Sequence, residues 1–153
     1  MVNWKNWKTY LFLLIPMVTG YITSFFCTVG KDAGSKVPAR PPSWVFGAVW
    51  PILYLFLGLS WVLLRGTNSH IIDILMTLNI VGLSAWIAIY GCKKDKKNAL
   101  YIILIVLLIA LQIFGYAWTQ NRMAAMMVTP FLAWILFATM LNYTEVNQEG
   151  YSC

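Results

Sequence analysis

Residues 41–58, PPSWVFGAVWPILYLFLG, carry the clearest structural signal in this chain. The Pro-Pro pair ends any preceding helix, and the apolar residues that follow begin a segment long enough to cross a membrane. On a helix, Phe46, Trp50 and Tyr54 follow one another at four-residue intervals and Gly58 continues the row, so they form one ribbon. Such a ribbon is either a stacking wall for a flat apolar ligand or ordinary helix packing.

The composition extends this membrane interpretation to the whole chain. The 153 residues are 60% hydrophobic and 10% charged, with a mean hydropathy of +0.70, whereas a soluble domain carries about a quarter charged residues. Backbone amides in lipid must be paired within their own segment, so each membrane-length apolar run must be a helix. We therefore predict an all-α membrane protein, one domain over residues 1–153, built as a bundle of five transmembrane helices near residues 9–29, 43–65, 71–91, 98–119 and 122–145. The first run lacks a small-x-small cleavage site, so we expect a helix there and not a cleaved signal.

The basic residues predict the orientation in the membrane. With five spans, the loops 30–42 and 92–97 and the C-terminus share one side, named here the Lys-rich end. That end carries seven of the 11 Lys and Arg residues, and the opposite side carries four. The positive-inside rule then places the C-terminus and the long first loop of this multi-pass protein in the cytoplasm. The net charge of +6 is a topology signal, and we expect no nucleic-acid partner.

The three cysteines, Cys27, Cys92 and Cys153, all fall at the Lys-rich end. An odd count without motif spacing, at an end predicted to be cytoplasmic, indicates free thiols. We expect these residues to act as small apolar side chains.

Unusual residues from four helices share one depth below the Lys-rich end. They are Gly20, Trp50, Asn79, Trp134 and Ala138. A rise of about 1.5 Å per residue places all of them roughly 10–16 Å deep, beneath the loop 30–42. These depths predict an apolar cavity walled by Trp50, Tyr54 and Trp134, with Asn79 as its polar group and the loop as a lid. Small-molecule sites are usually built from apolar walls with a few polar groups.

The predicted spans lack the residues that ion-coupled transport and acid–base catalysis usually require. The spans carry no Asp, Glu, Lys or Arg at mid-helix, although such residues mark the ion paths of pumps and coupled transporters. No Ser-His-Asp, Cys-His or paired-carboxylate arrangement occurs at membrane depth, so the sequence leans against an enzyme. His70, the only histidine, falls on the side away from the predicted cavity, which disfavours a histidine-held haem.

The chain resembles the tryptophan-rich sensory protein family, also called the translocator protein or peripheral benzodiazepine receptor family. Residues 41–58 are similar to the family pattern P-P-x-W-x-F-x-x-V-W-x-x-L-Y-x-x-M-G, and residues 130–142 to P-Y-x-x-W-x-x-F-A-x-x-L-N, with Phe131 in place of tyrosine. A P-x-x-x-G pattern at Pro16 and an L-N pair at Leu78 also match. The resemblance spans roughly residues 10–145, all five predicted helices.

The resemblance implies a five-helix bundle, commonly a homodimer, that binds porphyrins and benzodiazepine-type ligands in a pocket under the first loop. Small residues on the third span offer a surface for a second copy. We expect no obligatory cofactor, with porphyrin or haem as a ligand and membrane lipids as further partners. By the matching positions, with the aromatic ribbon and a stripe on the fifth span, the predicted ligand-binding residues are Gly20, Phe46, Trp50, Tyr54, Asn79, Phe131, Trp134 and Ala138.

Departures from the family pattern leave three functions open. The family usually has a tryptophan just before the Pro-Pro pair, where this chain has Ala39 and Arg40, and residues 144–153 carry no basic residue of the animal sterol-contact pattern. Light-driven porphyrin breakdown and sterol transport are therefore in doubt. The chain is expected to be a receptor or carrier for porphyrins and similar planar hydrophobic ligands. The alternatives are a membrane enzyme that degrades a bound porphyrin and a lipid- or sterol-binding scaffold without catalysis.

Overall fold

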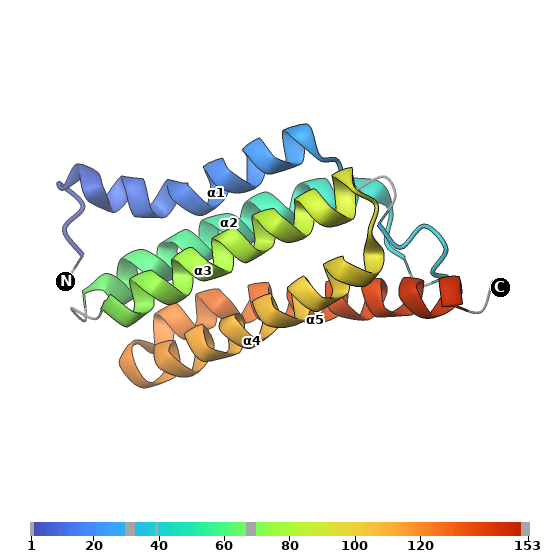
Figure 1. Ribbon diagram of the computed structural model, residues 1–153. Helices are drawn as coiled ribbons and strands as arrows, with labels where there is room; N and C mark the ends of the chain where they lie inside the picture. The colour runs from blue at the N-terminus through green and yellow to red at the C-terminus, as the bar shows by residue number, and fades with distance from the viewer. Residues whose placement is uncertain (1, 30–32, 39, 67–69, 151–153) are drawn as a thin grey trace.

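The computed structural model describes residues 2–29, 33–38, 40–66 and 70–150. Within these ranges it contains five helices long and apolar enough to cross a membrane and no strands, which confirms the predicted all-α membrane fold. In chain order the elements are α1 (Trp7–Phe26), α2 (Ser43–Arg65), α3 (His70–Ile87), the π-helix η1 (Ala88–Cys92), α4 (Lys96–Gln120) and α5 (Arg122–Gly150), as Figure 1 shows.

The helix ends follow local chemistry. Pro42 precedes the first residue of α2 with φ of −54° and an extended ψ, so the Pro-Pro pair sets that boundary where it was predicted. Asn6 caps α1, because its side-chain oxygen accepts a hydrogen bond from the Lys8 amide. Asp95 does the same for α4 through the Asn98 amide. Two helices depart from the prediction, since α1 ends at Phe26 and not at 29, and α5 continues from 145 to Gly150.

The five helices are arranged as a ring. α1 packs on α2 and α3, α2 on α5, α3 on α4, and α4 on α5, which closes the circle. Figure 1 shows the described ends of the chain at opposite ends of this bundle, as an odd number of spans requires. Cys153 and Ala39, which carried two of the expectations, lie outside the described residues.

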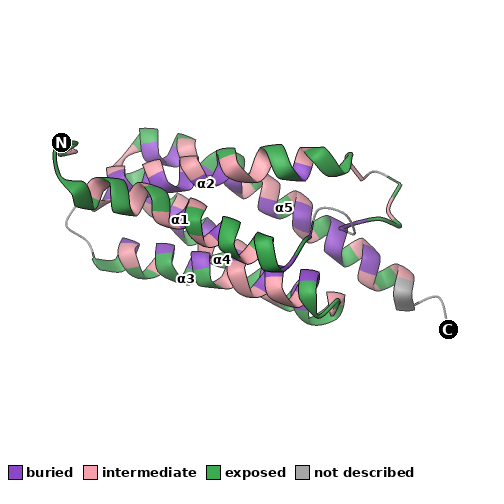
Figure 2. Cartoon of the chain, turned by 90° about the horizontal axis from the view of Figure 1, so that it is seen from above, coloured by how far each residue is buried: buried purple, intermediate pink, exposed green. Residues whose placement is uncertain are grey.

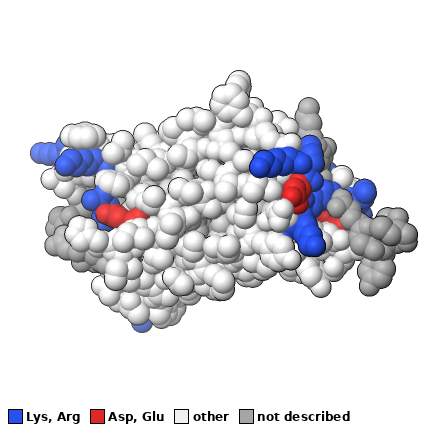
Figure 3. All heavy atoms as spheres, viewed as in Figure 1, with Lys and Arg blue, Asp and Glu red and all other residues white. Residues whose placement is uncertain are grey.

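The membrane-facing belt is visible in the charge distribution. Figure 3 shows Lys, Arg, Asp and Glu side chains at the two ends of the viewed face, with an uncharged band between them. Such a band is what the hydrocarbon core of a bilayer requires. The burial pattern in Figure 2 shows α1 mostly exposed or half-buried, and only 11% of its most apolar window is buried inside the bundle. α1 is therefore the helix least held by the rest of the chain.

The most extensive contact between two helices of the bundle is that of α4 with α5. α4 contributes a row of small or branched residues spaced three and four apart, which is the period of one helix face. These residues are fully buried: Ala99, Ile103, Val106, Ala110, Ile113 and Ala117. On α3, a side chain at Gly82 would meet Val106 at 2.7 Å. Gly82 thus serves packing within the chain, and the expectation of a second copy on the third span stays a prediction.

The expectation of free thiols at Cys27 and Cys92 is wrong. The two cysteines form a disulfide with a Cα–Cα distance of 4.9 Å, although they are 65 residues apart in sequence. Depth placed them at the same end of the bundle, but sequence spacing could not show that the end of α1 lies against η1. The bridge ties α1, otherwise loosely held, to the third span.

Candidate functional site

A hollow of about 430 Å³ lies among α1, α2 and the end of α3, near the Lys-rich end. Its volume falls within the range of small-molecule sites. The described residues that line it are Gly20, Tyr21, Ser24, Thr28, Val29, Ser43, Trp44, Phe46, Gly47, Trp50, Pro51, Tyr54, Trp86 and Ile87. None of these side chains carries a charge, so the hollow suits an apolar ligand body.

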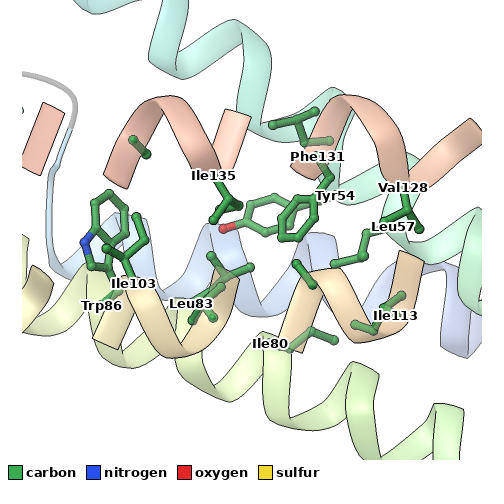
Figure 4. Packing of buried hydrophobic residues seen from close by; sticks show 14 of the residues in the cluster. Tyr54, Leu57, Ile80, Leu83, Trp86, Ile103, Ile113, Val128, Phe131 and Ile135 are labelled. Atoms are coloured by element: carbon green, nitrogen blue, oxygen red, sulfur yellow. The ribbon is translucent and has the colours of Figure 1, made fainter. Parts of the chain in front are cut away.

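An aromatic layer forms the wall on the side of α2 and α3. The Trp50 and Tyr54 rings are stacked, with centroids 5.4 Å apart and an interplanar angle of 28°. Trp86 of α3 lies 6.2 Å from Trp50 in a tilted arrangement. Trp50 is half-buried, whereas Tyr54 and Trp86 are buried and support its ring. A partly exposed ring of this kind offers a flat ligand a stacking surface. Figure 4 shows Tyr54 and Trp86 within the buried cluster that supports this wall.

Gly20 allows α1 to approach the aromatic layer. A side chain at this position would lie 2.8 Å from the Tyr54 hydroxyl and closer still to the ring carbons. Only a glycine leaves room for the Tyr54 ring there, and the ring is buried, so it cannot swing away without cost. The P-x-x-x-G pattern of the first span therefore has a packing reason: Pro16 and Gly20 are its two buried residues.

Four of the eight predicted ligand-binding residues line the hollow. They are Gly20, Phe46, Trp50 and Tyr54. Phe46, Trp50 and Tyr54 come from the ribbon of α2, Gly20 faces them from α1, and α1 and α2 pack together.

The other four predicted residues lie behind the wall or elsewhere in the core. Trp134 packs against Phe46, with centroids 5.6 Å apart, and against Trp50 at 6.4 Å, so it supports the aromatic layer from α5. Asn79 is fully buried and donates a hydrogen bond to the Val106 carbonyl, 3.3 Å away on α4.

Phe131 and Ala138 are buried in the core cluster. Asn79, Trp134 and Ala138 were predicted to share one depth with Trp50, yet none of the four residues is among those that line the hollow. Depth fixes a residue's height along the bundle and not its direction around it.

Trp86 lines the hollow although the sequence analysis did not predict it as a ligand-binding residue. Only 3% of it is exposed. Its indole N–H donates to the Asn142 Oδ1 at 3.4 Å. A signal was present in the sequence, because Asn79, Leu83, Trp86 and Tyr90 follow at i, i+4, i+7 and i+11 and therefore share one helix face.

Arg40 supplies positive charge beside the hollow. Its guanidinium lies over the Phe46 ring, 5.6 Å from the centroid, and its Nη2 donates to the Ser43 hydroxyl at 3.2 Å. Both partners line the hollow. A carboxylate on the edge of a bound ligand would meet this guanidinium, which is the geometry that Arg recognises best.

These features define a class of protein: a five-span helical membrane protein with an aromatic-walled, uncharged hollow between its helices near one membrane surface. The sequence profile of the TspO/MBR family matches residues 12–146, and the chain belongs to that family. The resemblance inferred from the motifs is thereby confirmed.

Individual relatives agree with this membership. The translocator protein of Homo sapiens is 34% identical over 119 residues, which cover 72% of this chain and 70% of that protein. The tryptophan-rich protein TspO of Chlorobaculum tepidum is 29% identical over 111 residues, covering 69% and 70% respectively. The tryptophan-rich protein TspO of Archaeoglobus fulgidus is 27% identical over 139 residues, covering 86% and 90%. The similarity thus extends across most of the helical bundle.

Proposed function

We propose that this protein is a membrane receptor or carrier that binds porphyrins and similar planar hydrophobic molecules in the hollow beside α1. The observation that carries the proposal is the stacked layer of Trp50, Tyr54 and Trp86 along a hollow of about 430 Å³. Aromatic faces bind flat ring systems by offset stacking. The uncharged lining accepts the ring body, and Arg40 lies where a ring carboxylate would project.

Protoporphyrin titration tests the proposal. The purified protein in nanodiscs is titrated with protoporphyrin, and binding is followed by the porphyrin absorbance band, so that removing a tryptophan does not remove the signal. We expect saturable binding that weakens about tenfold in Trp50→Ala, because it loses a stacking partner worth about 1.5 kcal/mol. Trp86→Ala should weaken it by a smaller factor, because Trp86 supports the Trp50 ring. Trp118→Ala is the matched control, since Trp118 is exposed on α4 outside the hollow.

Two outcomes would contradict the proposal or redirect it. Unsaturable binding, or equal affinity in the hollow variants and the control, would remove the hollow as the porphyrin site. Co-purified lipid without porphyrin binding would favour the scaffold alternative. Illumination of the bound complex, followed by product analysis, separates carriage from degradation. Products that differ from those of free porphyrin would favour the enzyme alternative.

We also propose that the Lys-rich end faces the cytoplasm. The support is the count of seven basic residues against four. The Cys27–Cys92 disulfide at the same end favours the opposite assignment, because disulfides persist in oxidising compartments. A reporter that is active only outside the cytoplasm, fused to the C-terminus, decides between them. The proposal predicts an inactive reporter, and an active one would reverse the orientation.

A further inference from the structure

Glu145 is a buried carboxylate outside the hollow that joins four parts of the chain. Only 1% of it is exposed. Its Oε1 accepts hydrogen bonds from the Gly34 amide at 2.9 Å and from Lys96 Nζ at 3.0 Å, and its Oε2 accepts one from the Tyr90 hydroxyl. These partners belong to the first loop, to the start of α4 and to η1. A buried carboxylate is tolerated only when charge and hydrogen bonds compensate its lost hydration, and here they do.

One line of contacts runs from this carboxylate to the rim of the hollow. Gly34 has a φ of +67°, a backbone conformation that favours glycine, and its amide points at the carboxylate. The preceding residue, Ala33, accepts a hydrogen bond from Arg40 Nε. Arg40 in turn holds Ser43 and covers Phe46, two lining residues. The described part of the first loop is thus fixed at one end by α5 and at the other by Ser43 and Phe46, which form the rim of the hollow.

A second line runs to the aromatic wall. The Tyr90 ring lies against Trp86 with centroids 5.2 Å apart, and Trp86 continues to Trp50. Asn142, one helical turn before Glu145, accepts from the Trp86 indole and donates to the Lys96 carbonyl at 2.9 Å. The polar face at the end of α5 therefore sets the position of Trp86 from two sides.

We propose that Glu145 is a positioning residue for the ligand-binding hollow, which it does not itself line. Its carboxylate fixes the rim through Gly34 and the wall through Tyr90, so it controls how long a planar ligand is retained. Lys96 provides the charge that permits a carboxylate in this place. The inference rests on the proposed function for its ligand, but the geometry that it describes can be measured without one.

Dissociation kinetics test retention. Protoporphyrin is chased from wild type and variants in nanodiscs, and the association and dissociation rates are measured separately. Glu145→Gln removes the charge, and Tyr90→Phe removes one hydroxyl while leaving the ring against Trp86. We expect dissociation to accelerate about tenfold in Glu145→Gln, the effect of losing a hydrogen bond to a charged group, and by a smaller factor in Tyr90→Phe. Asn147→Ala, at an exposed position of α5, is the control and should release porphyrin at the wild-type rate.

A ligand-free measurement keeps the two proposals separable. Hydrogen exchange of the segments 33–38 and 86–92 should rise in Glu145→Gln and in Tyr90→Phe, while exchange in the middle of α4 stays unchanged. If wild type binds no porphyrin, the proposed function fails and the exchange result alone decides the role of Glu145.

A lower melting temperature with unchanged dissociation and unchanged exchange of the two segments would reduce Glu145 to a stabilising residue and overturn the inference. Should Glu145→Gln fail to fold, Tyr90→Phe carries both tests.

Discussion

A methyl group at Gly58 would test whether the close approach of α1 and α2 sets the width of the hollow. A Cβ added there would lie 2.9 Å from the Leu13 carbonyl carbon and 3.1 Å from its Cα, and nearer still to its carbonyl oxygen. Carbon atoms settle at about 3.5–4.0 Å, so α1 must move away from α2 by about 1 Å. A backbone cannot rotate aside as a side chain can. The clash should therefore reach the upper end of the about 1–3 kcal/mol that overpacking costs.

The control for this experiment is Gly115→Ala on α4, where an added Cβ would meet nothing within 4 Å. Both substitutions gain the same helix propensity of about 1 kcal/mol, so the difference between the two variants isolates the clash. A difference of about 3 kcal/mol corresponds to roughly 6–12 °C in Tm for a chain of this size. Thermal melting followed by circular dichroism in detergent measures it.

The same displacement should change the hollow, because α1 supplies one of its walls through Gly20 and Tyr21. We expect Gly58→Ala to weaken protoporphyrin binding and Gly115→Ala to leave it unchanged. If both variants have the same melting temperature and bind porphyrin like the wild type, the close packing of α1 on α2 at Gly58 does not set the width of the hollow.

Three further predictions concern the bridge, the rim and a helix cap. Cys27→Ser should lower stability by about 4 kcal/mol, because the bridge to Cys92 closes a loop of 65 residues; melting with and without reductant should coincide in the variant and differ in wild type. Arg40→Gln should weaken binding of protoporphyrin about tenfold more than binding of its dimethyl ester, the worth of one charge-assisted hydrogen bond; equal losses for both ligands would refute a carboxylate contact. The backbone and side-chain hydrogen bonds from Asn98 hold the pKa of Asp95 below its ordinary value. The Asp95 cap therefore stabilises α4 fully above the unfolded-state pKa, and this stabilisation is lost as the pH falls through the lower folded-state pKa. Hydrogen exchange at the start of α4 between pH 2 and 6 should show this loss in wild type, and Asp95→Asn should abolish the dependence on pH.

The sequence predicted those features of the fold that depend on one helix at a time. The start of α2 at residue 43 follows from the Pro-Pro pair, and the row of Phe46, Trp50 and Tyr54 follows from the helical period alone. All three aromatic residues line the hollow, and Gly20 faces them from α1. Periodicity within a helix is local, so a single sequence contains it.

Features that depend on the arrangement of the helices around the ring could not be predicted in the same way. The Asn79 side chain donates to the Val106 carbonyl of α4 and Phe131 is buried in the core cluster, so neither lines the hollow. The pairing of Cys27 with Cys92 needed the same missing information. Nothing in the sequence marks Glu145 as buried, because an acidic residue near a helix end is normally solvated, and only its three partners explain its burial.

The exposed setting of α1 has a consequence for how affinity must be expressed. Tyr21 and Trp44 are both largely exposed and both line the hollow, so the cavity mouth meets acyl chains and not only water. An occupant has to displace lipid tails, and it arrives from the bilayer at the concentration set by its partition coefficient. Two molecules with equal affinity for the hollow but different bilayer partition coefficients will thus differ in apparent Kd. Dissociation constants for such a protein carry meaning only as mole fractions in a defined membrane.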